Sequence, residues 1–124
     1  MELMTREIAA KLIENDHEVV KTGECSDIVV VKYFNPCGPH TWHIVSGTPV
    51  DADGEPDYDT DSPHDWHLFG FCNLGDDMNA ELGYLMLSDL QGIDLMGGLG
   101  IERDLYLPDN TSLKAVQDSV KKYA

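Results

Sequence analysis

The sequence predicts one α+β domain over residues 1–124: a mainly antiparallel sheet of about five strands, with a helix near each end of the chain. Three observations support this fold class. The length fits a single domain. Five short apolar runs separated by turn residues fill the middle of the chain, and helical spacing of apolar residues occurs only near the termini. The order helix, five strands, helix is typical of a sheet with both helices packed on one face.

The first helix is expected over residues 5–15, where Thr5 can cap the start and apolar residues follow at helical spacing. A β-branched run over residues 28–34 then predicts a buried central strand. Residues 41–45 predict the next strand, ended by the turn residues at 46–47. The five-residue loop between these strands is rich in turn residues, so the two strands are expected to form a hairpin.

Three further strands are predicted, over residues 66–72, 83–87 and 101–107. A single helical turn at 88–91 and a glycine-rich loop separate the last two. From Ser112 onward the spacing predicts a C-terminal helix. Its apolar residues share one helical face: Leu113, Val116, Val120 and Tyr123.

Acidic residues dominate the charge of the chain. It has 23 Asp and Glu against 8 Lys and Arg, which gives a formal net charge of −15. Such a field repels nucleic acids and anionic membranes and attracts basic partners. The sequence therefore argues against direct binding to nucleic acid or to a membrane, and it favours a basic protein surface as the partner. Solubility, or adaptation to high salt, is the alternative explanation of the same charge.

The acidic segment from Asp51 to Asp65 contains seven acids in 15 residues and no Lys or Arg. Six of these acids occupy alternate positions: Asp51, Asp53, Glu55, Asp57, Asp59 and Asp61. In an extended chain, alternate residues point the same way and lie about 6.6 Å apart, so these six are expected to form a row of carboxylates. Such a row could occupy a basic groove that normally holds DNA. The alternative is a solvated loop between two strands, over about residues 48–65.

Neither calcium nor zinc is predicted beyond weak binding. An EF-hand loop beginning at Asp51 would need Gly at position 56 and Glu at position 62, and the chain has Pro56 and Ser62. Two His-x-Trp-His motifs, at 40–43 and 64–67, suggest zinc, but positions i and i+3 of a strand face opposite sides. No metal and no cofactor are therefore expected. The two tryptophans are expected to be core anchors on adjacent strands.

The cysteines and the N-terminus indicate a cytoplasmic protein. Cys25, Cys37 and Cys72 form no C-x-x-C pair. The first residues lack the basic and apolar regions of a signal peptide, and no apolar stretch approaches the length of about 18 residues that spans a membrane. Free thiols in the cytoplasm are the simplest account. No catalytic residues are predicted, although cysteine–histidine catalysis stays open without a motif to support it.

A polar pocket is the second candidate site, formed by Glu81, Glu102, Arg103 and Asp104. Alternation along the predicted last strand places Arg103 on the same face as Ile101 and Leu105, which is apolar. The guanidinium on such a face needs a carboxylate or carbonyl partner, and Glu81 is one candidate. A buried ion pair that fixes the sheet is the structural explanation of this arrangement. A polar binding cleft is the functional one.

Seven segments of the chain carry a likeness to a known family. They are Val29–Phe34, Thr41–Trp42, Trp66, Phe69–Gly70, Glu81–Tyr84, Ser88–Leu90 and Gly98–Tyr106. Together they resemble the bacterial domain-of-unknown-function family 2958, over about residues 1–108. The most specific parts are Glu81–Tyr84 and residues 100–105.

The resemblance implies a small protein of the kind carried on plasmids, integrative elements and phages, and no catalytic residues come with it. That setting favours an anti-defence role, such as blocking a restriction or CRISPR nuclease. We therefore expect a non-enzymatic, acidic interaction protein of a mobile element that binds a basic protein surface. The alternative is a small enzyme or ligand-binding domain whose polar cleft surrounds the second candidate site. The sequence leaves the partner and the oligomeric state open.

Overall fold

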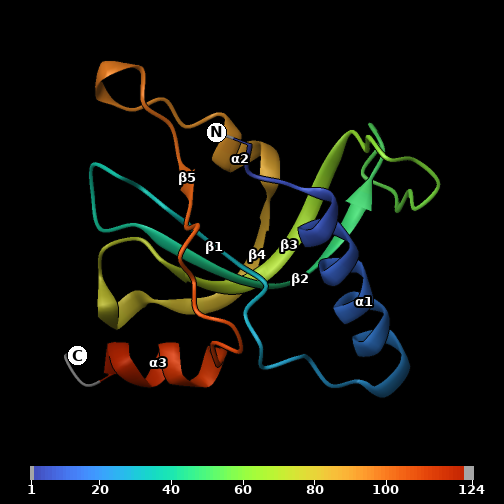
Figure 1. Cartoon of the computed structure of the whole chain (residues 1–124), viewed down its shortest axis with the longest axis horizontal. Helices are drawn as coiled ribbons and strands as arrows, with labels where there is room; N and C mark the ends of the chain where they lie inside the picture. The colour runs from blue at the N-terminus through green and yellow to red at the C-terminus, as the bar shows by residue number, and fades with distance from the viewer. Residues whose placement is uncertain (1, 122–124) are drawn as a thin grey trace.

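Five antiparallel strands form one sheet in the order β4-β3-β2-β1-β5, and the computed structural model describes residues 2–121 (Figure 1). The strands are β1 Val31–Phe34, β2 Thr41–Val50, β3 Asp65–Asn73, β4 Glu81–Met86 and β5 Glu102–Arg103. The helices are α1 Arg6–Thr22, α2 Leu87–Gln91 and α3 Leu113–Lys121, with 3-10 turns η1 Asp77–Asn79 and η2 Met96–Gly98. The predicted α+β fold with N-terminal and C-terminal helices is confirmed.

The two long helices pack on opposite faces of the sheet, so the expectation that they share one face is wrong. Alternate residues of β2 divide between two apolar clusters, with Ile44 in one and Val45 in the other. Leu12 of α1 belongs to the cluster of Ile44, whereas Leu113 of α3 belongs to that of Val45. The sheet is therefore apolar on both faces, and Figure 1 shows α1 and α3 near opposite ends of it.

The predicted anchors and apolar faces take their expected places in these clusters. Trp42 of β2 and Trp66 of β3 are both buried in the cluster beneath α1. Val116 and Val120 of α3 pack against the other cluster, as the helical spacing predicts. Tyr123, the fourth residue of that predicted face, lies outside the described residues.

Helix α1 is longer than predicted because a polar residue in its middle is part of the packing. The helix begins as expected after Thr5, whose side chain accepts from the backbone N–H of Ile8 at 3.2 Å. Asn15, the predicted end, is buried instead, and its side-chain amide donates to the backbone oxygen of Val45 at 2.8 Å. The helix ends seven residues later, at Thr22, and is capped by Gly23 with a φ of 78°.

Strand boundaries differ from the predictions at both ends of the sheet. Ser46 and Gly47, expected to end β2, pair instead with β3 beyond a bulge that follows Ile44. β5 has two residues, fewer than predicted, because the carboxylate of Asp104 accepts from the backbone N–H of Tyr106 and closes a turn there. The first predicted strand is also shorter, since Ile28 makes an isolated bridge to Ser112 and Val29 donates to the carbonyl of Thr111, just before α3.

Candidate functional site

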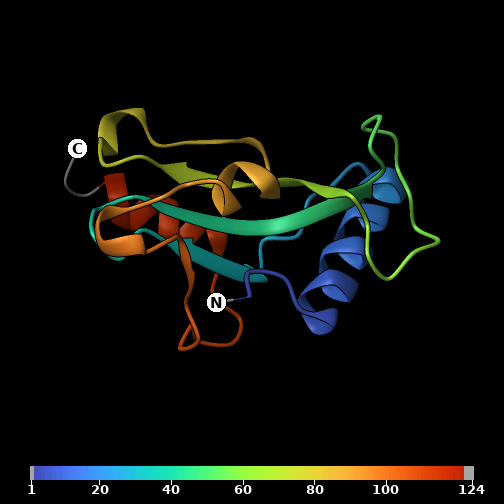
Figure 2. The same cartoon turned by 90° about the horizontal axis from the view of Figure 1, so that it is seen from above.

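The acidic segment lies between β2 and β3, at the end of the sheet next to α1 (Figure 2). It turns back on itself instead of extending as a row. Asp51 Oδ1 accepts from the backbone N–H of Asp53 at 2.9 Å and of Glu55 at 3.0 Å. The backbone N–H of Asp57 donates to the carbonyl of Pro49 at 2.8 Å, which brings the chain back beside β2. The expectation of six carboxylates along one edge is therefore wrong over this turn.

The six alternate acids divide into two structural and four free carboxylates. Asp51 and Asp57 are half-buried and accept from backbone N–H groups of the segment. The other four side chains are exposed, and within the described part of the chain they make no hydrogen bond or ion pair: Asp53, Glu55, Asp59 and Asp61. These four are the ones available to a partner.

Side-chain hydrogen bonds at Tyr58 and at Asp65 also attach the acidic segment to the rest of the molecule. Asp16 of α1 accepts from the hydroxyl of Tyr58 at 3.2 Å and from that of Thr48 at 3.0 Å. At the far end of the segment, Asp65 accepts from Ser88 and from the backbone N–H of Trp66. Burial opposes ionisation of Asp65, but the bonds from Ser88 and Trp66 outweigh it and hold its pKa below the usual range. The segment is therefore held at its middle, through Tyr58, and at its C-terminal end, through Asp65.

Negative charge extends well beyond this segment. The 70 residues from Tyr33 to Glu102 contain no Lys or Arg and 13 acids, whereas the other 54 residues carry 10 acids and 8 bases. The 13 acids are Asp51, Asp53, Glu55, Asp57, Asp59, Asp61, Asp65, Asp76, Asp77, Glu81, Asp89, Asp94 and Glu102. This span builds β2, β3, β4 and α2. We call it the cation-free half: it holds −13 of the net −15.

An exposed aromatic group lies on β3 and β4 in the cation-free half. Tyr84 is 68% exposed, and its ring stacks on that of His67 with centroids 4.8 Å apart and planes 7° apart. Phe69, opposite Tyr84 in the ladder, contacts the same ring at 4.9 Å. Leu82, two residues before Tyr84, is 44% exposed. Sequence reasoning missed this surface, although the alternation of Leu82, Tyr84 and Met86 along a strand was its visible signal.

The predicted polar pocket is not assembled. Glu81 is on β4 and Arg103 on β5, at the two opposite edges of the sheet with three strands between them. Glu81 is therefore not the partner of Arg103, and that expectation is wrong. Asp104 lies 3.8 Å from the ammonium of Lys32, and Glu102 lines a separate hollow beside the N-terminal residues. Alternation shows which residues of one strand share a face, but it does not show the order of the strands in the sheet. The distance between Glu81 and Arg103 depends on that order.

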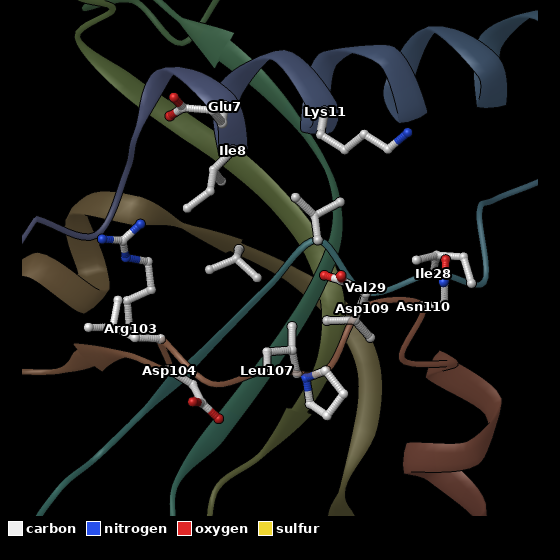
Figure 3. A pocket seen from close by; sticks show the side chains of 14 residues that line it. Glu7, Ile8, Lys11, Ile28, Val29, Arg103, Asp104, Leu107, Asp109 and Asn110 are labelled. Carbon is white, nitrogen blue, oxygen red and sulfur yellow. The ribbon is translucent and has the colours of Figure 1, made fainter.

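A cleft of about 700 Å³ does adjoin Arg103 and Asp104, between α1, β1 and the chain after β5 (Figure 3). Ile8 and Lys11 of α1 line one side, and Leu107 lies on the other. Its walls combine apolar side chains from four segments with charged groups at the rim. A volume of this size falls in the range of about 300–1,000 Å³ that is usual for small-molecule sites.

His43 is a buried histidine on the other side of β1 and β2. It is 9% exposed, and its Nδ1 has no hydrogen-bond partner among the described residues. Burial, and then the charge of Lys32, lower the pKa of His43 to about 4 against an opposing effect of Asp104. His43 is therefore neutral at physiological pH.

The described residues show no arrangement for a metal ion: no group of three or more His, Cys, Asp or Glu side chains is placed to hold one. Cys25 and Cys37 are exposed, Cys72 is half-buried, and all three are free thiols. Within the same part of the chain, no helix combines the length and apolar character needed to cross a membrane.

The fold and surface define a class: a small α+β protein with an acid-rich, cation-free half and an exposed aromatic group on one edge of its sheet. The family model of the protein family of unknown function DUF2958 matches residues 3–122. The chain therefore belongs to DUF2958, as its sequence resemblance indicated. Comparisons with curated proteins and with solved structures gave no match.

Proposed function

We propose that this protein is a non-enzymatic interaction protein whose cation-free half binds a basic surface of another protein in the cytoplasm. The observation that supports the proposal is the segregation of charge: −13 of the net −15 lies on residues 33–102. Complementary potential of this kind raises association rates and selects partners of opposite charge. The free thiols fit a reducing compartment.

The partner class that fits best is a nucleic-acid-binding protein, because the groove that binds phosphates is lined by Lys and Arg. In this proposal the four free carboxylates of the acidic segment take positions that phosphates otherwise occupy. A protein carried on a mobile element would gain from blocking a restriction or CRISPR nuclease in this way. What supports the choice is the charge, together with the segment's attachment at Tyr58 and at Asp65, which limits the entropy lost on binding.

The test starts with a pull-down from host lysate at low and at high salt. A basic protein captured only at low salt is then titrated with the acidic protein in the presence of its own nucleic acid. We expect displacement of the nucleic acid, and an affinity that falls steeply with salt. Binding that is insensitive to salt contradicts the proposal.

A matched pair of charge variants shows where the partner binds. The first carries Asp53→Asn, Glu55→Gln, Asp59→Asn and Asp61→Asn. The second carries the same loss of charge outside the cation-free half, with Glu18→Gln, Glu24→Gln, Asp109→Asn and Asp118→Asn, all of them exposed. At roughly 0.2–1 kcal/mol for each exposed ion pair, loss of four such pairs should weaken binding of the first variant about fourfold or more. Equal losses in both variants contradict a role for the acidic segment.

The cleft beneath α1 is a second candidate, as a small-molecule site. Its volume of about 700 Å³ and its apolar walls favour a ligand with an apolar body and one charged group. Fragment screening by NMR tests this function directly: ligands that shift the resonances of Ile8, Lys11 and Leu107 support it. If no fragment shifts those resonances, the cleft is a surface depression without this function.

A further inference from the structure

The outer edge of β4 is unpaired. β4 is the terminal strand in the order β4-β3-β2-β1-β5. Within the described part of the chain, the backbone of Glu81–Leu85 makes no backbone hydrogen bond outside its ladder with β3. A free row of backbone donors and acceptors is a template for pairing with another extended chain. We propose that β4 is a docking site for an extended, basic segment of a partner protein, which adds to the sheet as a further strand.

The sequence of β4 lacks the features that usually protect an edge strand. Natural edges carry Lys or Pro, or are broken by a bulge. β4 reads Glu-Leu-Gly-Tyr-Leu-Met, and its pairing with β3 runs without a bulge through all six residues. The opposite edge differs, because β5 has only two residues. At Gly83 an added Cβ would meet no atom within 4 Å, so the sheet face at the centre of the strand is uncovered there.

The side chains around this edge fit a cationic strand. Tyr84 presents a ring that is 68% exposed, and His67 stacked beneath it holds that ring in place. A guanidinium or ammonium group over such a ring gains a cation–π interaction. Leu82, 44% exposed on the same face, can contact the aliphatic stem of the next cationic side chain two residues along.

Charge selects the occupant. Asp76, Asp77 and Glu81 are exposed at one end of β4, and Asp89 is exposed beyond the other end. The cation-free half contains no Lys or Arg to offset them. A second copy of this chain is a poor occupant, because pairing two β4 strands would bring the same acids together. A basic segment meets carboxylates at both ends of the strand and an aromatic ring between them.

This inference rests on the proposed function and adds a specific contact to it, so the experiment separates the two. The probe is a synthetic eight-residue peptide that alternates Arg with Val, and its control has Glu in place of Arg. Two further versions carry N-methyl groups, one on every Arg and the other on every Val. In a strand, alternate N–H groups point to the same side, so only one version blocks the side that faces β4.

At about 20 mM salt we expect the Arg-Val peptide to bind, the Glu-Val peptide not to bind, and the amides of Glu81–Met86 to gain protection from hydrogen exchange. One N-methylated version should bind about tenfold more weakly and the other within about threefold of the unmodified peptide. Equal binding of both N-methylated versions, or protection confined to residues 51–61, overturns docking at β4 and leaves the charge proposal standing. No binding of the Arg-Val peptide overturns both.

A variant of the aromatic ring gives an independent check. Tyr84→Ala should weaken binding of the Arg-Val peptide about twofold to fivefold, since an exposed cation–π contact is worth about 0.5–1 kcal/mol. Tyr106→Ala is the matched control, because Tyr106 is also exposed but lies beyond β5 at the other edge of the sheet. Equal affinities of the two variants contradict a contact at Tyr84.

Discussion

The carbonyl oxygen of His43 lies so close to Gly70 that a Cβ on this glycine would sit 2.0 Å from it. The contact occurs where β2 bulges after Ile44, which Gly70 faces in the ladder. The atoms nearest to the added Cβ all belong to the backbone of His43 and Ile44. Backbone atoms cannot move aside as the end of a flexible side chain can. Gly70→Ala should therefore lower the free energy of unfolding by about 3 kcal/mol or more, measured by urea denaturation.

The control for this substitution is Gly83→Ala on the neighbouring strand. An added Cβ at Gly83 meets no atom within 4 Å. The free energy of unfolding should change by less than about 0.5 kcal/mol, because alanine costs the strand no contact. Similar losses at both glycines would show that general strand flexibility, and not the contact with His43, is responsible.

The buried His43 predicts a loss of stability at mildly acidic pH. Its pKa in the folded protein, about 4, lies below the value of about 6.5 expected when the chain is unfolded. The unfolded state therefore takes up the proton first, and the free energy of unfolding falls as pH drops from about 6.5 to about 4. The total loss is about 3 kcal/mol at a slope of about 1.4 kcal/mol per pH unit.

Urea denaturation at several pH values measures this slope, and His43→Gln is the comparison. The free energy of unfolding of the variant should change less with pH than that of the wild type between pH 4.5 and 6.5. An NMR titration gives a second measurement, in which the His43 ring should not protonate above about pH 5. If the ring titrates near its ordinary pKa, burial does not control it and the prediction fails.

The hydrogen bonds from Ser88 to Asp65 connect the start of α2 to the start of β3. Ser88→Ala removes the hydroxyl bond, and the pKa of Asp65 should rise toward its ordinary range. The variant should lose about 1 kcal/mol of unfolding free energy at neutral pH. Because the pKa of Asp65 is lowered in the folded protein, this contribution is present above the unfolded pKa and disappears as pH falls through the folded one. Matched wild-type and variant denaturation curves at pH 7 and pH 3 check both statements.

Asn15 attaches α1 to β2 by its bond to the carbonyl of Val45. Asn15→Ala leaves that buried carbonyl without its partner and should cost about 1–3 kcal/mol. Asn15→Asp is the informative second variant, because the carboxylate has a similar shape but no hydrogen to donate. It should be at least as destabilising at neutral pH. A stable Asn15→Asp protein would show that water or another donor satisfies Val45.

The number and order of the elements were predictable because hydrophobic spacing is local. The length of β2 was not, since Ser46 and Gly47 are turn residues by composition and only their pairing with Leu68 and Phe69 keeps them in the strand. The turn at Asp51 has a signal in the sequence, because Gly54 follows this aspartate three residues later. The alternation of acids at the same positions favoured an extended chain instead. The separation of Glu81 from Arg103 depends on strand order, which only the folded sheet defines.

The cation-free half carries −13 and the other 54 residues carry −2, so we expect the molecule to have an electric dipole as well as a net charge. In the field of a basic partner, a dipole experiences a torque that turns the acidic side toward the partner before contact. Collisions that would otherwise begin in the wrong orientation then become productive. Exposed acids far from any contact should therefore set the association rate constant, whereas residues of the contact itself should set how long the complex lasts.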